Sequence, residues 1–333
     1  MSLKPNPGPA AQRVLVIKLS AIGDFMLALG AARTVRRHHP NAEITLLTTP
    51  LFQAFAEACP YFDRVWTDGR PKTLGATLSM LRRLRKTDFD IVYDFQTSGR
   101  SANYFLAFWP KPPLWSGISL GCTYPHTNPA RAGMHSIDRL GEQLEQAGVP
   151  RGDGEWPPTP DFSWVLTSRG DRDDMQPAHF GLKGRYALLI PGASSTRSAK
   201  RWPEENYVAL AQHLGRLQIT PVVIGGQSEE VIARIIQDGE PKAVNLIGKT
   251  DFFQIVALGA NATIAIGNDT GPMHLSTLSG APGVALFATT MSNPDQASPR
   301  GAPVMVVFAP TLDQVSVEKV TQATDALLAD TAR

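Results

Sequence analysis

The sequence predicts an α/β protein with two Rossmann-like domains that face a central cleft. Three observations lead to this prediction. The chain has 333 residues, enough for two domains of ordinary size. Short β-branched runs alternate with segments of helical spacing, as in a doubly wound parallel sheet. The alternation stops in an irregular stretch rich in Pro, Gly, Asp and Trp, residues 148–184, and then begins again. A cleft between two such domains is a common ligand site.

The first half opens with a strand and a helix. Residues 13–18, Arg-Val-Leu-Val-Ile-Lys, form a β-branched run typical of a buried parallel strand. Residues 25–38 have apolar side chains near helical spacing, and Pro40 ends that helix. We expect the remaining elements of this half to be strands at 43–48, 64–66 and 90–95 and helices at 50–59, 74–86, 100–109 and 134–147.

The second half repeats the alternation, and the irregular stretch before it contains one expected strand near residues 162–166. Strands are predicted at 186–190, 220–224, 243–246, 263–266, 284–288 and 304–308, and helices at 204–217, 229–237, 252–260, 271–279 and 312–328. One arrangement left open is that the last helix packs back on the first domain. The predicted division is a disordered, Pro/Gly-rich tail at 1–12, a first domain at 13–165 and a second domain at 166–333.

The composition is that of a globular protein, with 43% hydrophobic and 19% charged residues. The net charge is only +2 but is unevenly distributed. Residues 1–150 carry 17 Lys and Arg against 11 Asp and Glu, whereas residues 151–333 carry 15 against 19. The basic half could face an anionic partner, and a solvated basic surface explains the difference equally well.

The N-terminal residues and the cysteines indicate the compartment. Cys59 and Cys122 have neither metal-ligand spacing nor a disulfide pattern, which favours a reducing compartment. Residues 1–12 lack the apolar run of a signal peptide or an anchor. No segment approaches the roughly 20 apolar residues that cross a bilayer. We therefore expect a cytoplasmic protein whose contact with a membrane is at most peripheral.

Several common motifs are absent. The first strand is not followed by Gly-x-Gly-x-x-Gly, and no Walker-type loop occurs, which argues against dinucleotide dehydrogenases and P-loop enzymes. His-Glu-x-x-His, Cys-x-x-Cys and Gly-x-Ser-x-Gly are also absent, so we expect no metal site and no serine hydrolase. A nucleic-acid binder has only the basic first half in its favour.

A strand–turn–helix corner at residues 266–280 is the first candidate site. An apolar run ends at Gly267 and is followed by Asn268, Asp269 and Thr270, after which a segment of small residues can form a helix. Ligands of α/β proteins bind at such strand ends, and a helix start suits a phosphate. Asp269 or Thr270 could equally serve only as the helix cap.

The loop at residues 191–203, Pro-Gly-Ala-Ser-Ser-Thr-Arg-Ser-Ala-Lys-Arg-Trp-Pro, is the second candidate site. It combines the hydroxyls of Ser195 and Thr196 with three cations, among them Lys200, directly before a helix. This chemistry fits a pyrophosphate. The alternative is a polar surface loop in which Pro203 starts the helix. The nearby Asp269 corner favours the phosphate interpretation.

Two carboxylates follow other strands. Glu229 could accept hydrogen bonds from a ribose, although an acidic residue in the first turn of a helix is the somewhat stronger interpretation of its spacing. Asp24 follows the first strand at a helix start, where it would act as an N-cap or as a general base. His126, His135 and His274 are further titratable candidates, but a single histidine is more often structural.

Three segments together resemble the bacterial ADP-heptose:lipopolysaccharide heptosyltransferases, glycosyltransferase family 9. They are 16–24, Val-Ile-Lys-Leu-Ser-Ala-Ile-Gly-Asp, 200–203, Lys-Arg-Trp-Pro, and 269–274, Asp-Thr-Gly-Pro-Met-His. The resemblance covers nearly the whole chain after residue 12. It implies a GT-B fold in which the first domain binds the acceptor and the second domain binds the nucleotide sugar. It also implies inverting transfer without a metal or another cofactor.

The resemblance also implies roles for individual residues. Asp24 would be the general base that deprotonates the acceptor hydroxyl. Ser195, Thr196 and Lys200 would hold the donor diphosphate, Glu229 would contact the ribose, and the nucleotide-sugar corner would consist of Asp269, Thr270, Gly271 and His274. The implied partners are ADP-heptose as donor and a lipopolysaccharide core acceptor. The basic residues 82–86 could in addition approach the inner face of the inner membrane.

Two alternatives remain at this point. A sugar-nucleotide epimerase of the same architecture would convert its substrate without an acceptor. A non-catalytic protein that binds a nucleotide sugar would tolerate replacement of Asp24 without a change in function.

Overall fold

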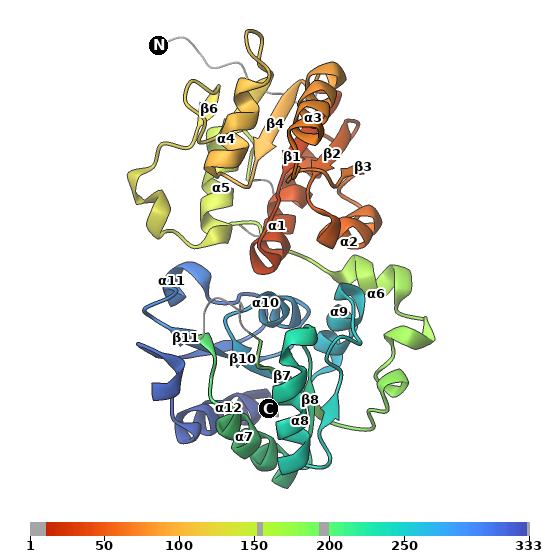
Figure 1. Ribbon diagram of the computed structural model, residues 1–333, viewed down its shortest axis with the longest axis vertical. Coiled ribbons are helices and arrows are strands. Elements are labelled where there is room, and N and C mark those ends of the chain that lie inside the picture. The colour runs from red at the N-terminus through yellow and green to blue at the C-terminus, as the bar shows by residue number, and fades with distance from the viewer. Residues whose placement is uncertain (1–10, 152–155, 193–199, 332–333) are drawn as a thin grey trace. The chain divides into compact units, whose positions relative to one another are not determined.

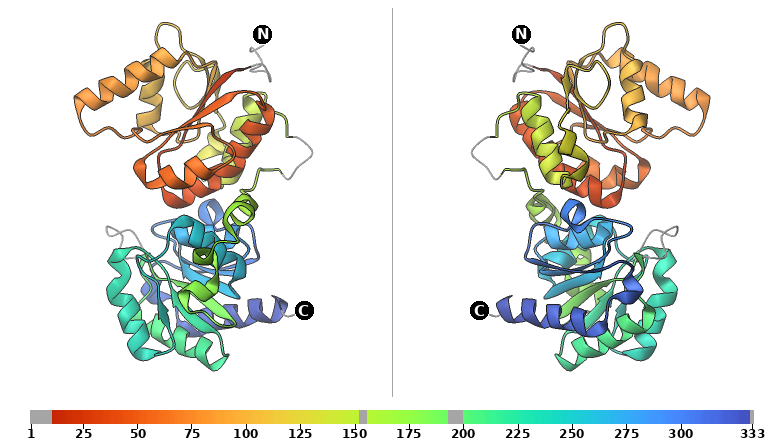
Figure 2. Two further views of the ribbon diagram at one scale, coloured as in Figure 1. Left: turned by 90° about the vertical axis from the view of Figure 1, so that its right-hand side faces the viewer. Right: turned by 90° about the vertical axis from the view of Figure 1, so that its left-hand side faces the viewer.

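The computed structural model describes residues 11–151, 156–192 and 200–331. The chain divides into two compact units, Met1–Pro160 and Asp161–Arg333 (Figures 1 and 2). Each unit contains one six-stranded parallel sheet with helices on its two faces. This arrangement confirms the predicted α/β class with two Rossmann-like halves.

The first unit has the strand order β3-β2-β1-β4-β5-β6. Its strands are β1 (Arg13–Ile17), β2 (Glu43–Leu47), β3 (Arg64–Trp66), β4 (Ile91–Asp94), β5 (Leu114–Gly117) and β6 (Tyr124–Pro125). Its α-helices are α1 (Ile22–His38), α2 (Gln53–Ala58), α3 (Leu74–Thr87), α4 (Gly99–Leu106) and α5 (Ser136–Gln146). The central strand β1 lies between β2 and β4.

The two faces of the first sheet follow from the alternation of side chains along β1. Leu15 and Ile17 lie in a buried cluster with side chains of α3 and α4, such as Phe105. Because successive strand side chains point to opposite faces, Val14 and Val16 lie on the other face. Helices α1 and α5, which pack against each other, belong to the unit as well. The β-branched run therefore forms a strand that is buried on both faces, as predicted.

The second unit has the strand order β12-β11-β10-β7-β8-β9. Its strands are β7 (Tyr186–Ile190), β8 (Thr220–Val223), β9 (Val244–Asn245), β10 (Ile264–Asn268), β11 (Gly283–Ala288) and β12 (Val304–Ala309). Its α-helices are α6 (Ser163–Arg169), α7 (Glu204–Arg216), α8 (Glu230–Gly239), α9 (Phe252–Asn261), α10 (Gly271–Leu278), α11 (Pro294–Ala297) and α12 (Val317–Thr331). Strands β7 and β10 are adjacent at the centre.

The last helix packs within its own unit. Val320 and Leu327 of α12 are buried in one core cluster with Leu210 of α7 and Leu286 of β11. Helix α12 is therefore part of the core of the second unit. It lies over the second sheet, next to α7 (Figure 2).

The predicted strand at 162–166 is a helix, α6. Its first turn is stabilised because the Ser163 amide donates to Asp161 Oδ1 at 2.9 Å. Val165 is buried, whereas Leu166 is exposed. A run of two or three apolar residues fits either structure, so periodicity could not decide between them. The predicted domain boundary after residue 165 lies inside α6, and the compact units divide between Pro160 and Asp161.

Helix α1 begins at Ile22, three residues before the predicted start. The Phe25 amide already donates to the Ala21 carbonyl at 2.8 Å, which closes the first helical turn. Asp24 therefore lies within that turn and not at the N-cap position. The short strands β5 and β6 were not predicted. The first follows Pro110, Pro112 and Pro113, and the second has only two residues.

Both cysteines are buried, and neither is part of a disulfide. Burial raises the pKa of the Cys59 thiol to about 12, so this side chain stays neutral and unreactive. Among the helices of the described ranges, none combines the length and the apolar character needed to cross a membrane.

Candidate functional site

Four loops of the second unit follow strands that are neighbours in its sheet. Lys200 follows β7, Glu229 follows β8, Asp269 follows β10 and Ser292 follows β11. Because parallel strands end at the same edge of a sheet, these loops gather at the edge where α/β proteins bind ligands.

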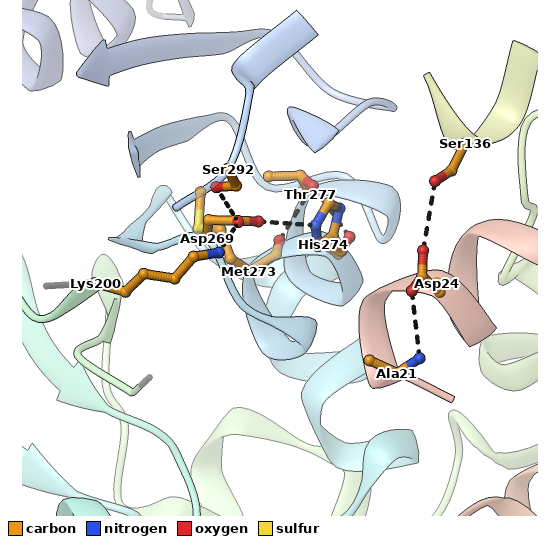
Figure 3. Close-up of polar contacts among 9 residues, drawn as sticks. All are labelled: Ala21, Asp24, Ser136, Lys200, Asp269, Met273, His274, Thr277 and Ser292. Carbon is orange, nitrogen blue, oxygen red and sulfur yellow. Dashed lines mark hydrogen bonds and ion pairs between the residues drawn. The ribbon is translucent and has the colours of Figure 1, made fainter. Parts of the chain in front are cut away.

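The carboxylate of Asp269 is the centre of this corner (Figure 3). Its Oδ2 atom accepts hydrogen bonds from Lys200 Nζ at 2.5 Å and from Ser292 Oγ at 2.8 Å. His274 Nε2 lies 3.5 Å from Oδ1. The side chains of Lys200 and Asp269 are only 9% and 10% exposed. The corner therefore holds a buried ion pair with a histidine beside it.

The ionisation of Asp269 follows from these partners. Burial by itself opposes the charged form. The hydrogen bonds and the electrostatic attraction of His274 and Lys200 outweigh burial and lower the pKa of this carboxyl to about 2. Asp269 is thus negatively charged at any physiological pH, and it holds the Lys200 ammonium at a defined position.

The start of α10 has an unusual cap. Thr270 occupies the N-cap position, but its side chain accepts no capping hydrogen bond. In the part of the chain that the structure describes, the buried atoms Thr270 Oγ1 and His274 Nδ1 have no hydrogen-bond partner. The side chain of Asp269 is occupied by Lys200 and Ser292. The interpretation that Asp269 or Thr270 merely caps the helix is therefore not supported, and the hydroxyl and the ring nitrogen remain available for a ligand.

Asn268, at the end of β10, joins this corner to the neighbouring strand. Its side chain is fully buried. Its Nδ2 atom donates to the carbonyls of Pro191 and Gly192 at 2.8 and 3.2 Å, and its Oδ1 atom accepts from the Tyr207 hydroxyl at 3.0 Å. Asn268 thereby positions the loop after β7 relative to Asp269.

Trp202 anchors the segment that carries Lys200. Its ring is 1% exposed, its Nε1 atom donates to the Val315 carbonyl at 2.8 Å, and it packs edge-on against Tyr207. The tryptophan of the Lys-Arg-Trp-Pro segment is therefore structural, and it places the adjacent lysine. Ser195 and Thr196, predicted to hold the diphosphate, lie outside the described residues.

Glu229 lies at the end of a single 3-10 turn and is 8% exposed. Its Oε2 atom accepts from the Gly226 amide at 3.0 Å, and its Oε1 atom accepts from Ser228 Oγ at 2.6 Å. A Cβ atom on Gly192 would lie 3.4 Å from the Glu229 carboxyl carbon, so this carboxylate borders the loop after β7. Glu229 thus stabilises its own turn and also lies at the ligand-binding edge.

In the first unit, Asp24 lies in the first turn of α1 and is half-buried. Its Oδ2 atom accepts from the Ala21 amide at 3.3 Å, and its Oδ1 atom accepts from Ser136 Oγ at 3.4 Å (Figure 3). The predicted N-cap role is wrong, because Asp24 is the third residue of the helix and bonds back to the residue before it. The carboxylate is held from α1 and from α5.

A cluster of charged groups surrounds this position. Lys18 is buried and donates to the Phe95 carbonyl at 3.2 Å. Burial lowers the pKa of Lys18, while Asp24 and Asp94 act in the opposite direction. Burial raises the pKa of Asp94 to about 6, although backbone amides and Lys18 favour its ionised form. Both Lys18 and Asp94 lie at the carboxyl ends of the central strands, on the same side of the sheet as Asp24.

The two other predicted histidines have structural partners. His126 Nδ1 accepts from Arg131 Nε at 3.0 Å, and His126 lies 3.7 Å from Glu142. Burial and the charge of Arg131 lower the pKa of His126. His135 is the N-cap of α5, where its Nδ1 atom accepts from the Ile137 amide at 3.2 Å. His274, in contrast, lies beside the predicted site residue Asp269.

The structure thus brings Lys200, Asp269 and His274 together, and it places Glu229 at the same edge of the second sheet. It also shows contacts that the sequence did not reveal. Asn268, which follows the apolar run of the predicted corner, is a buried amide at the end of β10 that bonds to the loop after β7. Ser292 and Ser136 come from distant segments, and nothing in their local sequence indicates their contacts. Over residues 11–151, 156–192 and 200–331, no three His, Cys, Asp or Glu side chains form a group that could hold a metal ion.

Comparisons with known proteins identify the family of the chain. Residues 77–326 match glycosyltransferase family 9 (heptosyltransferase). The chain is 26% identical to lipopolysaccharide heptosyltransferase 2 of Salmonella typhimurium over 303 residues, 86% of this chain and 85% of that protein. It is 22% identical to the lipopolysaccharide core heptosyltransferase OpsX of Haemophilus influenzae over 293 residues, 84% of this chain and 80% of that protein.

Solved structures share the fold. The ADP-heptose LPS heptosyltransferase II of E. coli superimposes with a TM-score of 0.76 at 22% identity, covering 97% of this chain and all of that one. The predicted GT-B class is thereby confirmed. The family match argues against the epimerase and the non-catalytic binding protein. Because this match covers well over half of the chain, the protein belongs to glycosyltransferase family 9 (heptosyltransferase) and is an enzyme.

Proposed function

We propose that the protein transfers a heptose from ADP-heptose to a lipopolysaccharide core acceptor. The observation that carries this proposal is the corner formed by Lys200, Asp269 and His274 inside the segment that matches the family. The names of the curated relatives support the heptose and the lipopolysaccharide core, and the description of the E. coli structure supports ADP-heptose.

The second unit is proposed to bind the donor. The diphosphate would lie at the start of α10, where helix amides and the helix dipole favour an anion. Lys200 would supply a fixed positive charge, and Thr270 would supply a hydroxyl that has no hydrogen-bond partner among the described residues. Ser195 and Thr196 are proposed as further diphosphate ligands. Glu229 would accept hydrogen bonds from the ribose, because its carboxylate lies at the same sheet edge.

The first unit is proposed to bind the acceptor, with Asp24 as the general base. The acceptor oxygen forms a bond to the anomeric carbon of the heptose while the bond from that carbon to the diphosphate oxygen breaks. The hydroxyl proton passes to Asp24, and ADP departs. A single displacement of this kind inverts the configuration at the anomeric carbon. We propose that Lys200 and the α10 amides stabilise the departing diphosphate, which would make transfer independent of a metal.

Two measurements test this function. The first is calorimetric titration with ADP, UDP and GDP without added metal. Selective binding of ADP supports the proposed donor, and preference for UDP or GDP would replace it. The second is mass-spectrometric detection of heptose transfer from ADP-heptose to a purified lipopolysaccharide core that lacks heptose. Absence of the heptosylated product with every core tested would refute the proposed reaction.

We further propose that the protein works at the inner face of the inner membrane through peripheral contact. A hollow of about 870 Å³ at the amino end of the first sheet is lined by Arg13, Arg64, Arg83 and Lys86. The lining also includes Glu43, which pairs with Arg64 at 2.7 Å. Cations exceed carboxylates along this lining, so anionic lipid headgroups would be attracted to it.

Vesicle flotation tests this contact. The wild type is expected to bind vesicles rich in phosphatidylglycerol at low salt, and to detach from them as salt screens the attraction. Lys86→Glu is expected to weaken binding, whereas the control Lys242→Glu in the second unit leaves it unchanged. Equal binding to neutral vesicles, or binding indifferent to salt, would contradict the proposed surface.

A further inference from the structure

We propose that Ser136, itself held by Arg139, is a positioning residue that orients the carboxylate of Asp24 for proton removal. This inference rests on the proposed function, in which Asp24 is the base. It assigns a task to the start of α5, a segment that neither the sequence motifs nor the family resemblance had connected with Asp24.

The hydrogen bonds in this region form a directed chain. Ser136 Oγ lies 3.4 Å from Asp24 Oδ1, and Arg139 Nη2 lies 3.4 Å from Ser136 Oγ. A carboxylate can only accept and a guanidinium can only donate. The single hydroxyl hydrogen of Ser136 must therefore point to Asp24, while Arg139 donates to the hydroxyl oxygen. The direction of each hydrogen bond is thus determined by the two outer groups.

The chain restrains the rotation of the Asp24 carboxylate. Oδ2 accepts from the Ala21 amide in the turn before α1, and Oδ1 accepts from Ser136 (Figure 3). One hydrogen bond to each oxygen fixes the plane of the carboxylate and leaves the other lone pairs free. A base held in this way meets the acceptor hydroxyl without first losing rotational freedom, which is how positioning lowers a barrier.

Helix α5 is itself rigidly attached where Ser136 begins it. The buried Gln143 donates through Nε2 to the Asp94 carbonyl at 3.0 Å and to the carbonyl and hydroxyl of Ser116, each at 3.3 Å. These carbonyls belong to the ends of β4 and β5. His135 caps the helix. Ser136 is therefore held at the carboxyl end of the sheet by its own helix, and Asp24 is held there by α1.

The charges that act near Asp24 come from several elements. Lys18 follows β1, Asp94 ends β4, Arg139 lies on α5 and Arg131 lies just before that helix. Lys18 interacts electrostatically with Asp24, Asp94, Arg131 and Arg139. Arg131 also interacts electrostatically with Arg139 and Asp94. The neutral replacement Ser136→Ala leaves all of these charges in place, so it tests the hydrogen bond to Asp24 by itself.

The kinetic test compares Ser136→Ala with Ser136→Thr. The alanine variant is expected to lower kcat about 10-fold, since one hydrogen bond to a charged group is lost, and to leave ADP affinity unchanged. Threonine keeps the hydroxyl and should restore most of the turnover. Arg139→Gln should lower kcat by less than Ser136→Ala does, because the serine hydroxyl is still present.

A matched control is Ser163→Ala, which removes an exposed serine from the first position of another helix, α6. It should leave kcat and ADP affinity unchanged. If Ser136→Ala keeps wild-type turnover, or if Ser136→Thr loses as much as Ser136→Ala, the positioning role is wrong. A Ser136→Ala variant that loses ADP affinity in the same proportion as kcat would also contradict it.

A second readout does not depend on the reaction. Carboxyl-carbon NMR of ¹³C-labelled aspartate at a fixed pH, with Asp24 assigned from an Asp24→Asn spectrum, reports on the hydrogen bonds of this side chain. Ser136→Ala should move the Asp24 signal, and an unchanged signal would overturn the inference. If the wild type transfers no heptose, the proposed function fails, and the NMR comparison still decides whether Ser136 acts on Asp24.

Discussion

Asp94 and Asp269 are buried carboxyls at the ends of central strands, one in each unit, yet their pKa values lie on opposite sides of the ordinary value. The pKa of Asp94 is raised to about 6, and that of Asp269 is lowered to about 2. Both side chains lose most of their hydration. The difference comes from the direct partners, because His274 and Lys200 both contact the Asp269 carboxylate, whereas Lys18 donates to the Phe95 carbonyl.

The hydrogen bonds of Asp94 show what backbone amides can do without a direct ion pair. Its Oδ1 atom accepts from the amides of Gln96 and Thr97 at 3.1 and 3.0 Å. Within the described residues its Oδ2 atom has no partner. Two amide hydrogen bonds therefore do not compensate burial here, whereas an ammonium and a histidine do so at Asp269. Asp269 in the second unit is therefore charged at any physiological pH, whereas the charge of Asp94 in the first unit changes near pH 6.

The largest expected effect separates the tasks of the two units. Asp24→Asn should lower kcat by about 10²–10⁴-fold, because general-base assistance is lost. Calorimetric ADP affinity should not change, since the donor is proposed to bind to the other unit. Turnover close to that of the wild type would remove Asp24 from the mechanism.

The next largest effect is expected from breaking the Lys200–Asp269 ion pair in the second unit, where the donor is proposed to bind. Lys200→Met should destabilise the second unit by about 3–5 kcal/mol, because the buried Asp269 is left without its cation. ADP affinity should fall as well. Amide hydrogen exchange of β10 and calorimetry measure the two effects, with Arg201→Met as the matched control at the adjacent exposed position. If the double replacement with Asp269→Asn is as unstable as Lys200→Met alone, the ion pair is not the cause.

The third effect concerns Asp94, whose folded pKa lies above its unfolded value of 3.8. Such a group favours folding below the unfolded pKa, and this contribution is lost as the pH rises from about 4 to 6. The loss is about 2–3 kcal/mol. Hydrogen exchange of β4 should show stability falling over this pH range in the wild type. Asp94→Asn should abolish the fall, and an equal fall in that variant would assign it to another group.

The smallest effect concerns Asp269, whose contribution to stability depends on pH in the opposite direction to that of Asp94. Asp269 has a folded pKa of about 2, below its unfolded value of 3.8. Its contribution is present above the unfolded pKa and is lost as the pH falls from about 4 to 2. The loss is about 2 kcal/mol. The protection factors of the β10 amides, which compare each exchange rate with its intrinsic value at the same pH, should fall as the pH falls over this range. Asp269→Asn should remove this dependence on pH. A β10 that keeps full protection at pH 2 would show that Asp269 is not coupled to folding.

The regular elements of both sheets were predictable because their signal is local. The β-branched run at 13–18 and the strand at 186–190 are buried on both faces, which their composition alone indicates. Short elements were less predictable. Residues 162–166 are predicted as a strand but form α6, and the sequence carries no signal for β5 and β6, because segments of five residues or fewer have no clear period.

The residues of the candidate site also differ in how well the sequence predicts them. Lys200, Asp269 and His274 could be recognised because strand-end loops with cations, hydroxyls and a helix start have a distinctive composition. Asp24 was recognised by the same means, although its place inside the first turn of α1 was not. Ser195 and Thr196 remain predictions.

By itself the sequence determined the alternation of strands and helices, the two-part division and the family segments, because these depend on neighbouring residues and on their order. Tertiary structure alone decided the partners. Ser292 reaches Asp269 across 23 positions, and Ser136 reaches Asp24 across 112. The signs of the two aspartate pKa shifts were likewise decided by folding, since burial and the distance to a cation exist only after the strands have assembled.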